Sequence, residues 1–228
     1  MKIIFVRHGH PDYKLDCLTE LGHLQAEAVA KKLESRNIQR VFASTRGRAL
    51  ETAAHIAARL GLEIERCDFM QEIGWGSIDE EPLYLNGHPW HVAADMVSNG
   101  QSIVVPDWDI REPFNRNKVV ARVRQVEEGL DLWLSELGYE RDGFYYRVRE
   151  GNPDTIVMVS HGGSSSAAFA HLLNLPFPLF CVAIRPNFTA VTEVSFEGEE
   201  GSLISPQVKL LNDAQHIAGI SVKNDYGM

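Results

Sequence analysis

The chain has 228 residues, of which 44% are hydrophobic, and this is enough to bury a full core in one large domain. Its 22 Lys and Arg residues against 31 Asp and Glu residues give a formal net charge of −9, which argues against nonspecific binding to nucleic acid or to anionic membranes. The three cysteines, Cys17, Cys67 and Cys181, are widely separated and form no C-x-x-C pair, which indicates free thiols in a reducing compartment. The first apolar run is too short for a signal peptide or a membrane span, so we expect a cytoplasmic protein.

The N-terminal third of the chain alternates between strand and helix patterns. Four apolar residues at 3–6 predict a short buried strand, which ends in Arg7, His8 and Gly9. The order strand, helix, strand, helix, strand, with connections of crossover length, predicts a parallel sheet. The further elements of this part are a helix from the N-cap Thr19 to about Ser35, a strand over 40–44, a helix between the candidate cap Thr45 and Gly61, and a strand over 62–66.

Residues from about 74 to 115 break this alternation. They are rich in Gly, Pro, Trp, Asn, His and Asp, and they contain one short helical pattern at about 90–97. We expect an insertion within a single domain of residues 1–228, placed to cover the edge of the sheet as a substrate lid. An ordinary surface elaboration is the alternative interpretation of the same segment.

The C-terminal half returns to regular patterns. A long amphipathic helix over 119–137 is followed by a hairpin turn at Asp142 and Gly143. A second apolar run, Thr155–Ser160, ends in His161, Gly162 and Gly163 and leads into a helix. Two final strands over 190–196 and 207–211 have a joint short enough for an antiparallel pair.

Two strands that each end in His-Gly predict a functional site. Because buried parallel strands deliver their last residues to the carboxyl edge of a sheet, His8 and His161 are expected to meet there beside Arg7. Arg46 and Arg48 begin the helix after the second strand, at the same edge, and their spacing alone does not decide between them. Arginine suits bidentate phosphate binding, so the pattern predicts a local anion pocket in an acidic protein.

Glu72 adds an acid to this set, because it follows the third strand and emerges near the same edge. A carboxyl that is partly desolvated in a closed pocket can hold a proton and act as a general acid. Two histidines, one or two arginines and one glutamate match phosphoryl transfer through an imidazole nitrogen, with side chains supplying the positive charge and no metal required. The attacking imidazole must be neutral, so its other nitrogen is expected to donate to a backbone carbonyl.

The ordered set of motifs resembles the histidine phosphatase superfamily, also called the phosphoglycerate mutase-like family. The resemblance implies a three-layer α/β/α fold with a mostly parallel central sheet, one antiparallel edge and an inserted lid. Its motifs are R-H-G at 7–9, L-T-E-L-G-H-L-Q-A at 18–26, F-A-S-T-R-G-R-A-L-E-T-A at 42–53, E-I-G-W-G at 72–76 and V-S-H-G-G at 159–163.

The resemblance also implies roles for single residues. His8 is then the phosphorylated nucleophile, and Glu72 is the proton donor. It favours Arg48 over Arg46, and it gives Thr19 the role of a cap that positions the first loop. The residues expected to bind the phosphoryl group or the substrate are Arg7, Arg48, His161, Gly162 and His10.

Three departures from the family pattern bear on the substrate. His10 stands where the family usually has Glu or Gln, and no Asn follows in that loop. Residues 78–80 read I-D-E where W-E-G is common. The N-E-R-H-Y-G signature of glycolytic mutases is absent, which favours a phosphatase that acts on a small phosphorylated metabolite without a cofactor.

Three alternatives remain open at this stage. One is phosphoglycerate mutase-type phosphoryl transfer, and the second is a binding protein that holds a phosphorylated ligand without turnover. The third is a metal hydrolase that uses His88 and His91 with Asp107 and Asp109, for which the spacing is poor. The sequence leaves the oligomeric state open, with a homodimer as one option, and it does not identify the substrate.

Overall fold

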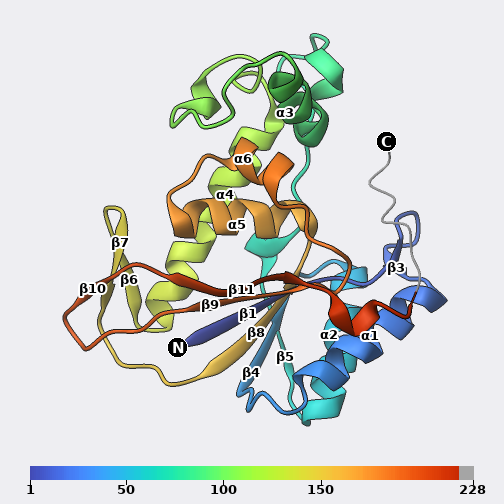
Figure 1. Cartoon of the computed structure of the whole chain (residues 1–228), viewed down its shortest axis with the longest axis vertical. Coiled ribbons are helices and arrows are strands. Elements are labelled where there is room, and N and C mark those ends of the chain that lie inside the picture. Colours follow the sequence, from blue (N-terminus) through green and yellow to red (C-terminus); the bar gives the residue numbers. More distant parts are fainter. Residues whose placement is uncertain (221–228) are drawn as a thin grey trace.

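A computed structural model describes residues 1–220, and its central layer is a six-stranded sheet (Figure 1). β1, β8, β4 and β5 run parallel, and β9 runs against them at the edge that β11 completes. The predicted, mostly parallel sheet with an antiparallel edge is therefore confirmed, while residues 221–228 of the predicted domain lie outside the described part. In sheet order, the strands are β11 (Gln207–Asp213), β9 (Val191–Ser195), β1 (Lys2–Arg7), β8 (Thr155–Ser160), β4 (Arg40–Ala43) and β5 (Ile64–Arg66).

Helices cover both faces of the sheet and make the three layers. Ile3 and Phe5 of β1 belong to the core that contains buried residues of α4 (Lys118–Glu136) and α5 (Gly162–Leu173). Ile4 and Val6 belong to a second core with buried residues of α1 (Glu20–Leu33) and α2 (Gly47–Leu60). A strand buried on both faces explains why 3–6 is a continuous apolar run rather than an alternating one.

The ends of α1 and α2 show one confirmed cap and one wrong prediction. Thr19 is the N-cap of α1, because its side chain accepts a hydrogen bond from the Gly22 N–H at 3.1 Å. Gly61 ends α2 in the left-handed region, with φ of 67°. Thr45 does not cap α2, since its hydroxyl donates to Asp68 at 2.7 Å and Arg46 takes the N-cap position.

The structure contains several short elements that the sequence did not predict. The predicted hairpin is present as β6 (Tyr139–Asp142) and β7 (Tyr145–Val148), but β10 (Leu203–Ile204) joins it to make a separate three-stranded sheet. Strands of two residues and helices of three to seven residues carry too few side chains for a clear periodic pattern. The other unpredicted elements are β2 (Pro11–Asp12), β3 (Cys17–Leu18), α6 (Phe177–Ala183), and the 3₁₀ helices η1 (Asp68–Met70) and η4 (Gln215–Ile217).

The segment predicted as an insertion lies at one end of the molecule, drawn in green at the top of Figure 1, and its buried hydrophobic residues belong to the core shared with α4 and α5. It contains η2 (Tyr84–Gly87), α3 (Pro89–Ser98) and η3 (Trp108–Ile110), so the predicted short helix is confirmed. Trp90 and Trp108 pack on Phe177 of α6, with ring centroids 6.5 and 5.4 Å apart. The insertion therefore rests on the α4 and α5 side of the sheet.

Backbone contacts close the base of this insertion. Lys118 N donates to the Gly76 carbonyl at 2.8 Å, and Ile78 N donates to the Arg116 carbonyl at 3.0 Å. The side chain of Asn117 is buried between the two flanks, where it accepts from Gly76 N and donates to the Gly87 carbonyl at 2.7 Å. The two ends of the insertion thus meet in one clasp at the start of α4.

The three cysteines are all free, as predicted. Cys67 and Cys181 are buried, and burial raises the pKa of the Cys67 thiol to about 12. Within residues 1–220, no helix is both long enough and apolar enough to cross a membrane.

Replacement of the α1 cap tests how this helix is held. In Thr19→Ala the Gly22 N–H loses its acceptor, so we expect the free energy of unfolding to fall by about 1 kcal/mol. Urea denaturation followed by circular dichroism measures the change, and Thr19→Ser, which keeps the hydroxyl, should lie closer to the parent. Equal stability of Thr19→Ala and the parent would show that the cap is dispensable.

Candidate active site

Four neighbouring strands deliver the predicted residues to one edge of the sheet. β1 ends at Arg7 and is followed by His8, and its neighbour β8 ends at Ser160 and is followed by His161. Arg48 lies in the first turn of α2, after β4, and Glu72 follows β5 and η1. The sheet order β1-β8-β4-β5 therefore brings together side chains that are far apart in the sequence.

His8 is fully buried, and its contacts fix which nitrogen carries the proton. Its Nδ1 lies 2.7 Å from the Gly9 carbonyl oxygen, which can only accept, so Nδ1 is the donor. Nε2 is left with its lone pair and accepts from Arg48 Nε at 3.2 Å. Burial lowers the pKa of His8 well below its usual value, and the charges of Arg7 and Arg48 lower it further. The ring is thus held neutral, as expected from the sequence.

Two buried guanidinium groups flank this imidazole. Arg48 contacts His8, whereas Arg46 is exposed at the N-cap of α2. Arg7 donates to the Pro186 carbonyl at 2.6 Å and lies over the ring of Phe188, 4.1 Å from its centroid. Two buried cations with little access to water make a strong site for an anion.

His161 lies beside His8 at this edge of the sheet. The two rings are T-shaped, with centroids 5.1 Å apart, and Ser44 Oγ lies 2.8 Å from His161 Nε2. Burial lowers the pKa of His161 well below its usual value, with His8 as the next cause. Within residues 1–220, His161 Nδ1 is buried without a hydrogen-bond partner, which is a position that a ligand oxygen would satisfy.

Glu72 is anchored at the start of α5, the helix that begins next to His161. Its Oε1 accepts three backbone hydrogen bonds, from Ile73 N at 3.0 Å, Gly163 N at 2.9 Å and Ser164 N at 3.2 Å. These bonds and the two arginines favour the ionised form, but burial outweighs them and raises the pKa of Glu72. Since these hydrogen bonds all go to Oε1, Oε2 is the oxygen that can carry a proton.

The two remaining predicted residues border this pocket. Gly162 is the first residue of α5, and a side chain at its position would lie 3.6 Å from Arg7 Nε. His10 is tethered to the start of α1, because its N–H donates to Gln25 at 2.7 Å and its Nδ1 lies 2.9 Å from Thr19 Oγ1. The ring of His10 packs against Phe188, with centroids 5.4 Å apart.

Some residues that touch the predicted ones have no signal of their own in the sequence. Ser44 contacts His161, and Thr52 Oγ1 accepts from Gly9 N at 3.0 Å and donates to the Arg48 carbonyl at 2.8 Å. Both lie within the motif at 42–53, but no spacing rule singles them out. Asp16 forms an ion pair with Arg48, and its only sequence signal is a carboxylate in the first loop. Phe188 precedes β9 in an irregular segment, so no pattern predicts its contacts with Arg7, His8 and His10.

The four residues considered as alternative metal ligands do not come together in one group. His88 and His91 stack in the insertion with ring centroids 4.0 Å apart. Asp107 pairs with Arg111, and Asp109 pairs with Arg124. Among residues 1–220, no group of three or more His, Cys, Asp or Glu side chains is arranged to hold a metal ion.

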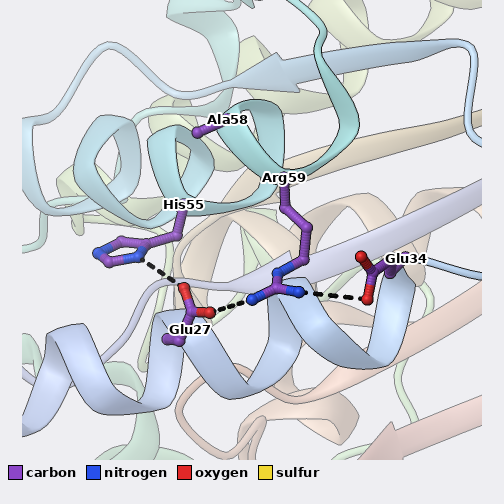
Figure 2. Close-up of a pocket in the computed structure, with 5 residues that line it drawn as sticks. All are labelled: Glu27, Glu34, His55, Ala58 and Arg59. Atoms are coloured by element: carbon purple, nitrogen blue, oxygen red, sulfur yellow. Dashed lines mark hydrogen bonds and ion pairs between the residues drawn. The ribbon is translucent and has the colours of Figure 1, made fainter.

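A hollow away from this site lies between α1 and α2 (Figure 2). Its lining residues are paired with one another, since Glu27 binds both His55 and Arg59, and Arg59 also binds Glu34 at 3.2 Å. It contains none of the predicted site residues and is open to solvent, so its ion pairs are individually weak.

Comparison with known sequences identifies the chain's relatives. Residues 3–209 match the sequence model of the histidine phosphatase superfamily (branch 1). The glucosyl-3-phosphoglycerate phosphatase of Mycobacterium tuberculosis is 29% identical over 188 residues, which cover 77% of this chain and 76% of that relative. The resemblance stated from the sequence motifs is confirmed.

Two solved structures that match this fold are named as phosphatases. The phosphoserine phosphatase of Entamoeba histolytica, in complex with 3-phosphoglyceric acid, matches with a TM-score of 0.62 at 23% identity, covering 95% of this chain and 98% of that one. A native mycobacterial glucosyl-3-phosphoglycerate phosphatase matches with a TM-score of 0.62 at 22% identity, covering 92% and 98% of the two chains. At these identities the matches show a shared fold.

The lowered pKa of His8 predicts an acid-sensitive fold. As the pH falls through the ordinary imidazole range, near ~6.5, the unfolded chain takes up a proton that folded His8 does not, so the free energy of unfolding falls. One such group contributes at most about 1.4 kcal/mol per pH unit. We expect His8→Gln to lose less stability than the parent between pH 7 and pH 5 in urea titrations. An equal loss in both proteins would contradict a buried neutral His8.

Proposed function

The chain belongs to the histidine phosphatase superfamily, and on that premise we propose that it hydrolyses phosphomonoesters of small metabolites through a phosphohistidine at His8. The observation that carries the proposal is the state of that imidazole. It is buried and neutral, its Nδ1 proton is committed to the Gly9 carbonyl, and its Nε2 lone pair lies beside Arg48. An imidazole held in this way is a nucleophile that needs no deprotonation before attack.

In the first step, His8 Nε2 attacks phosphorus, the N–P bond forms and the bond to the leaving oxygen breaks. Arg7 and Arg48 stabilise the charge that spreads over the transferring group, and His161 Nδ1 donates to one of its oxygens. Gly162, which has no side chain, keeps the space beside Arg7 open for these oxygens. The positive charge that phosphoryl transfer requires thus comes from side chains.

Glu72 supplies the proton for the leaving oxygen. Its raised pKa favours the protonated form in the free site, and Oε2 is the oxygen without a backbone bond. In the second step the Glu72 carboxylate takes a proton from water, water attacks phosphorus, and the N–P bond to His8 breaks. The same carboxyl therefore serves as acid and then as base.

The substrate is a small phosphorylated metabolite. The relatives are named for phosphoserine and for glucosyl-3-phosphoglycerate, which are both phosphomonoesters of small molecules. His10 borders the pocket through Phe188 and occupies the position where the family usually has Glu or Gln, so we assign it a substrate contact.

The insertion of residues 74–115 acts as the lid of this site. Trp75 is three residues beyond Glu72, and its ring packs against His88 with centroids 4.5 Å apart. Three residues of extended chain span at most about 11 Å. Trp75 and His88 therefore lie close enough to Glu72 to contact the leaving group of the substrate. Within one single domain, this segment determines which substrate is accepted, while the residues at the sheet edge carry out the phosphoryl transfer.

The first test compares the parent with His8→Ala on p-nitrophenyl phosphate in the presence of a chelator. We expect the parent to release phosphate and His8→Ala to lose more than about 1,000-fold in kcat, because no other side chain replaces the nucleophile. His23→Ala, which removes an exposed histidine on α1, is the matched control and should keep parental turnover.

Retained turnover in His8→Ala would end the covalent-histidine proposal, and loss of parental activity with the chelator would point to a metal hydrolase. An inactive parent would leave mutase-type transfer or phospho-ligand binding. Transfer of phosphate from 2,3-bisphosphoglycerate to His8 separates these two.

Leaving groups of different basicity test the role of Glu72. In Glu72→Gln we expect kcat/KM to fall by about 100-fold or more for an alkyl phosphate, but by less than about 10-fold for p-nitrophenyl phosphate, whose leaving oxygen needs no proton. Steady-state kinetics on both substrates give the ratio, and Glu63→Gln, an exposed carboxyl beside β5, should not change it. Equal losses on the two substrates would exclude Glu72 as the acid.

A further inference from the structure

Asp16 places a carboxylate directly on the phosphate-binding machinery. Its Oδ1 forms an ion pair with Arg48 Nη1, and its Oδ2 accepts from Gly47 N at 3.0 Å. Both oxygens are thus used, one on the guanidinium and one on the first N–H of α2. These two donors are of the kind that otherwise attract a phosphate oxygen.

The backbone builds this contact rather than leaving it to a flexible side chain. Asp16 has φ of 53°, in the left-handed region, and its carbonyl approaches Gly47 so closely that a Cβ there would lie 2.1 Å from the oxygen. Glycine is therefore required at 47. The end of the loop is fixed by Glu51, which accepts from Leu18 N at 2.6 Å.

Asp16 forms the solvent-facing side of the pair. Its side chain is 34% exposed, whereas that of Arg48 is 9% exposed. Arg48 gives Nε to His8 and Nη1 to Asp16, which leaves Nη2 to meet a phosphate oxygen. The phosphate and the Asp16 carboxylate must therefore share one guanidinium, and two anions on one cation weaken each other's binding.

We propose that Asp16 is a positioning residue that holds Arg48 against His8 and, as a built-in anion, limits how tightly the pocket holds phosphate, so that the product leaves. The proposal rests on the proposed phosphatase function. With Asp16, the nearby charges of Arg7, Arg48 and Asp16 amount to one net positive charge instead of two. The exposed Arg46 adds a cation at the same helix end, but solvent screens it.

The test measures binding of inorganic phosphate to the parent and to Asp16→Asn by isothermal titration calorimetry, beside steady-state kinetics on p-nitrophenyl phosphate. Asparagine keeps the size of the side chain and an acceptor for Gly47 N but removes the charge. We expect the Kd for phosphate to fall by roughly tenfold, the effect of one nearby unit charge in a partly hydrated site, with a parallel fall in KM. A merely structural ion pair would not tighten anion binding.

The matched control is Asp12→Asn, which removes a carboxylate from the same loop. Asp12 accepts from Lys14 N and Leu15 N and has no contact with Arg48, so its Kd for phosphate should stay within about twofold of the parent. Should Asp16→Asn fail to fold by circular dichroism, Asp16→Ser removes the same charge and carries the same expectation.

An unchanged or weaker affinity for phosphate in a folded Asp16 variant would overturn the proposal. Phosphate binding needs no turnover, so the two proposals fail separately. A parent that binds phosphate more weakly than Asp16→Asn but releases none from p-nitrophenyl phosphate refutes the phosphatase function and leaves the role of Asp16 in anion binding standing.

Discussion

Parallel pairing of β1, β8, β4 and β5 is the constraint on which the rest of the molecule depends. It aligns four strand ends, so each segment that follows them contributes to one pocket. The register of β1 against β8, with Arg7 opposite Ser160, brings the rings of His8 and His161 into edge contact. Burial of β1 on both faces fixes this register. A slip of one residue would turn Ile3 and Phe5 toward the core of α1 and α2, and Ile4 and Val6 toward the core of α4 and α5.

Desolvation gives this pocket its chemistry. The same burial keeps His8 and His161 neutral and raises the pKa of Glu72, while it strengthens the field of two arginines that remain charged. Backbone groups then set the orientation of each side chain, with the Gly9 carbonyl on His8 and three N–H groups on Glu72. Burial thus shifts the pKa of the two imidazoles and that of the carboxyl in opposite directions, and each shift favours the neutral form.

The sequence predicted the layers, the parallel sheet and the residues that the pocket brings together, because strand ends followed by His-Gly, Arg and Glu carry both a local pattern and a topological rule. It could not predict Asp16 or Phe188, whose contacts depend on how irregular loops fold back. Thr45 was a reasonable cap by residue type, but the nearby Asp68 takes its hydroxyl. The β10 strand, with two residues, and α6, with seven, were missed because such short segments give no clear periodic pattern.

The clasp at Asn117 has a consequence for how such chains diverge. Glu72 precedes the clasp in the sequence, and α4 follows it. The two ends of the segment between 78 and 116 are therefore hydrogen-bonded to each other at its base. A segment joined in this way can be lengthened, shortened or exchanged while Glu72 and α4 keep their places. Natural variation and laboratory grafting can therefore replace this segment at its closed base without moving the sheet edge that holds His8 and His161.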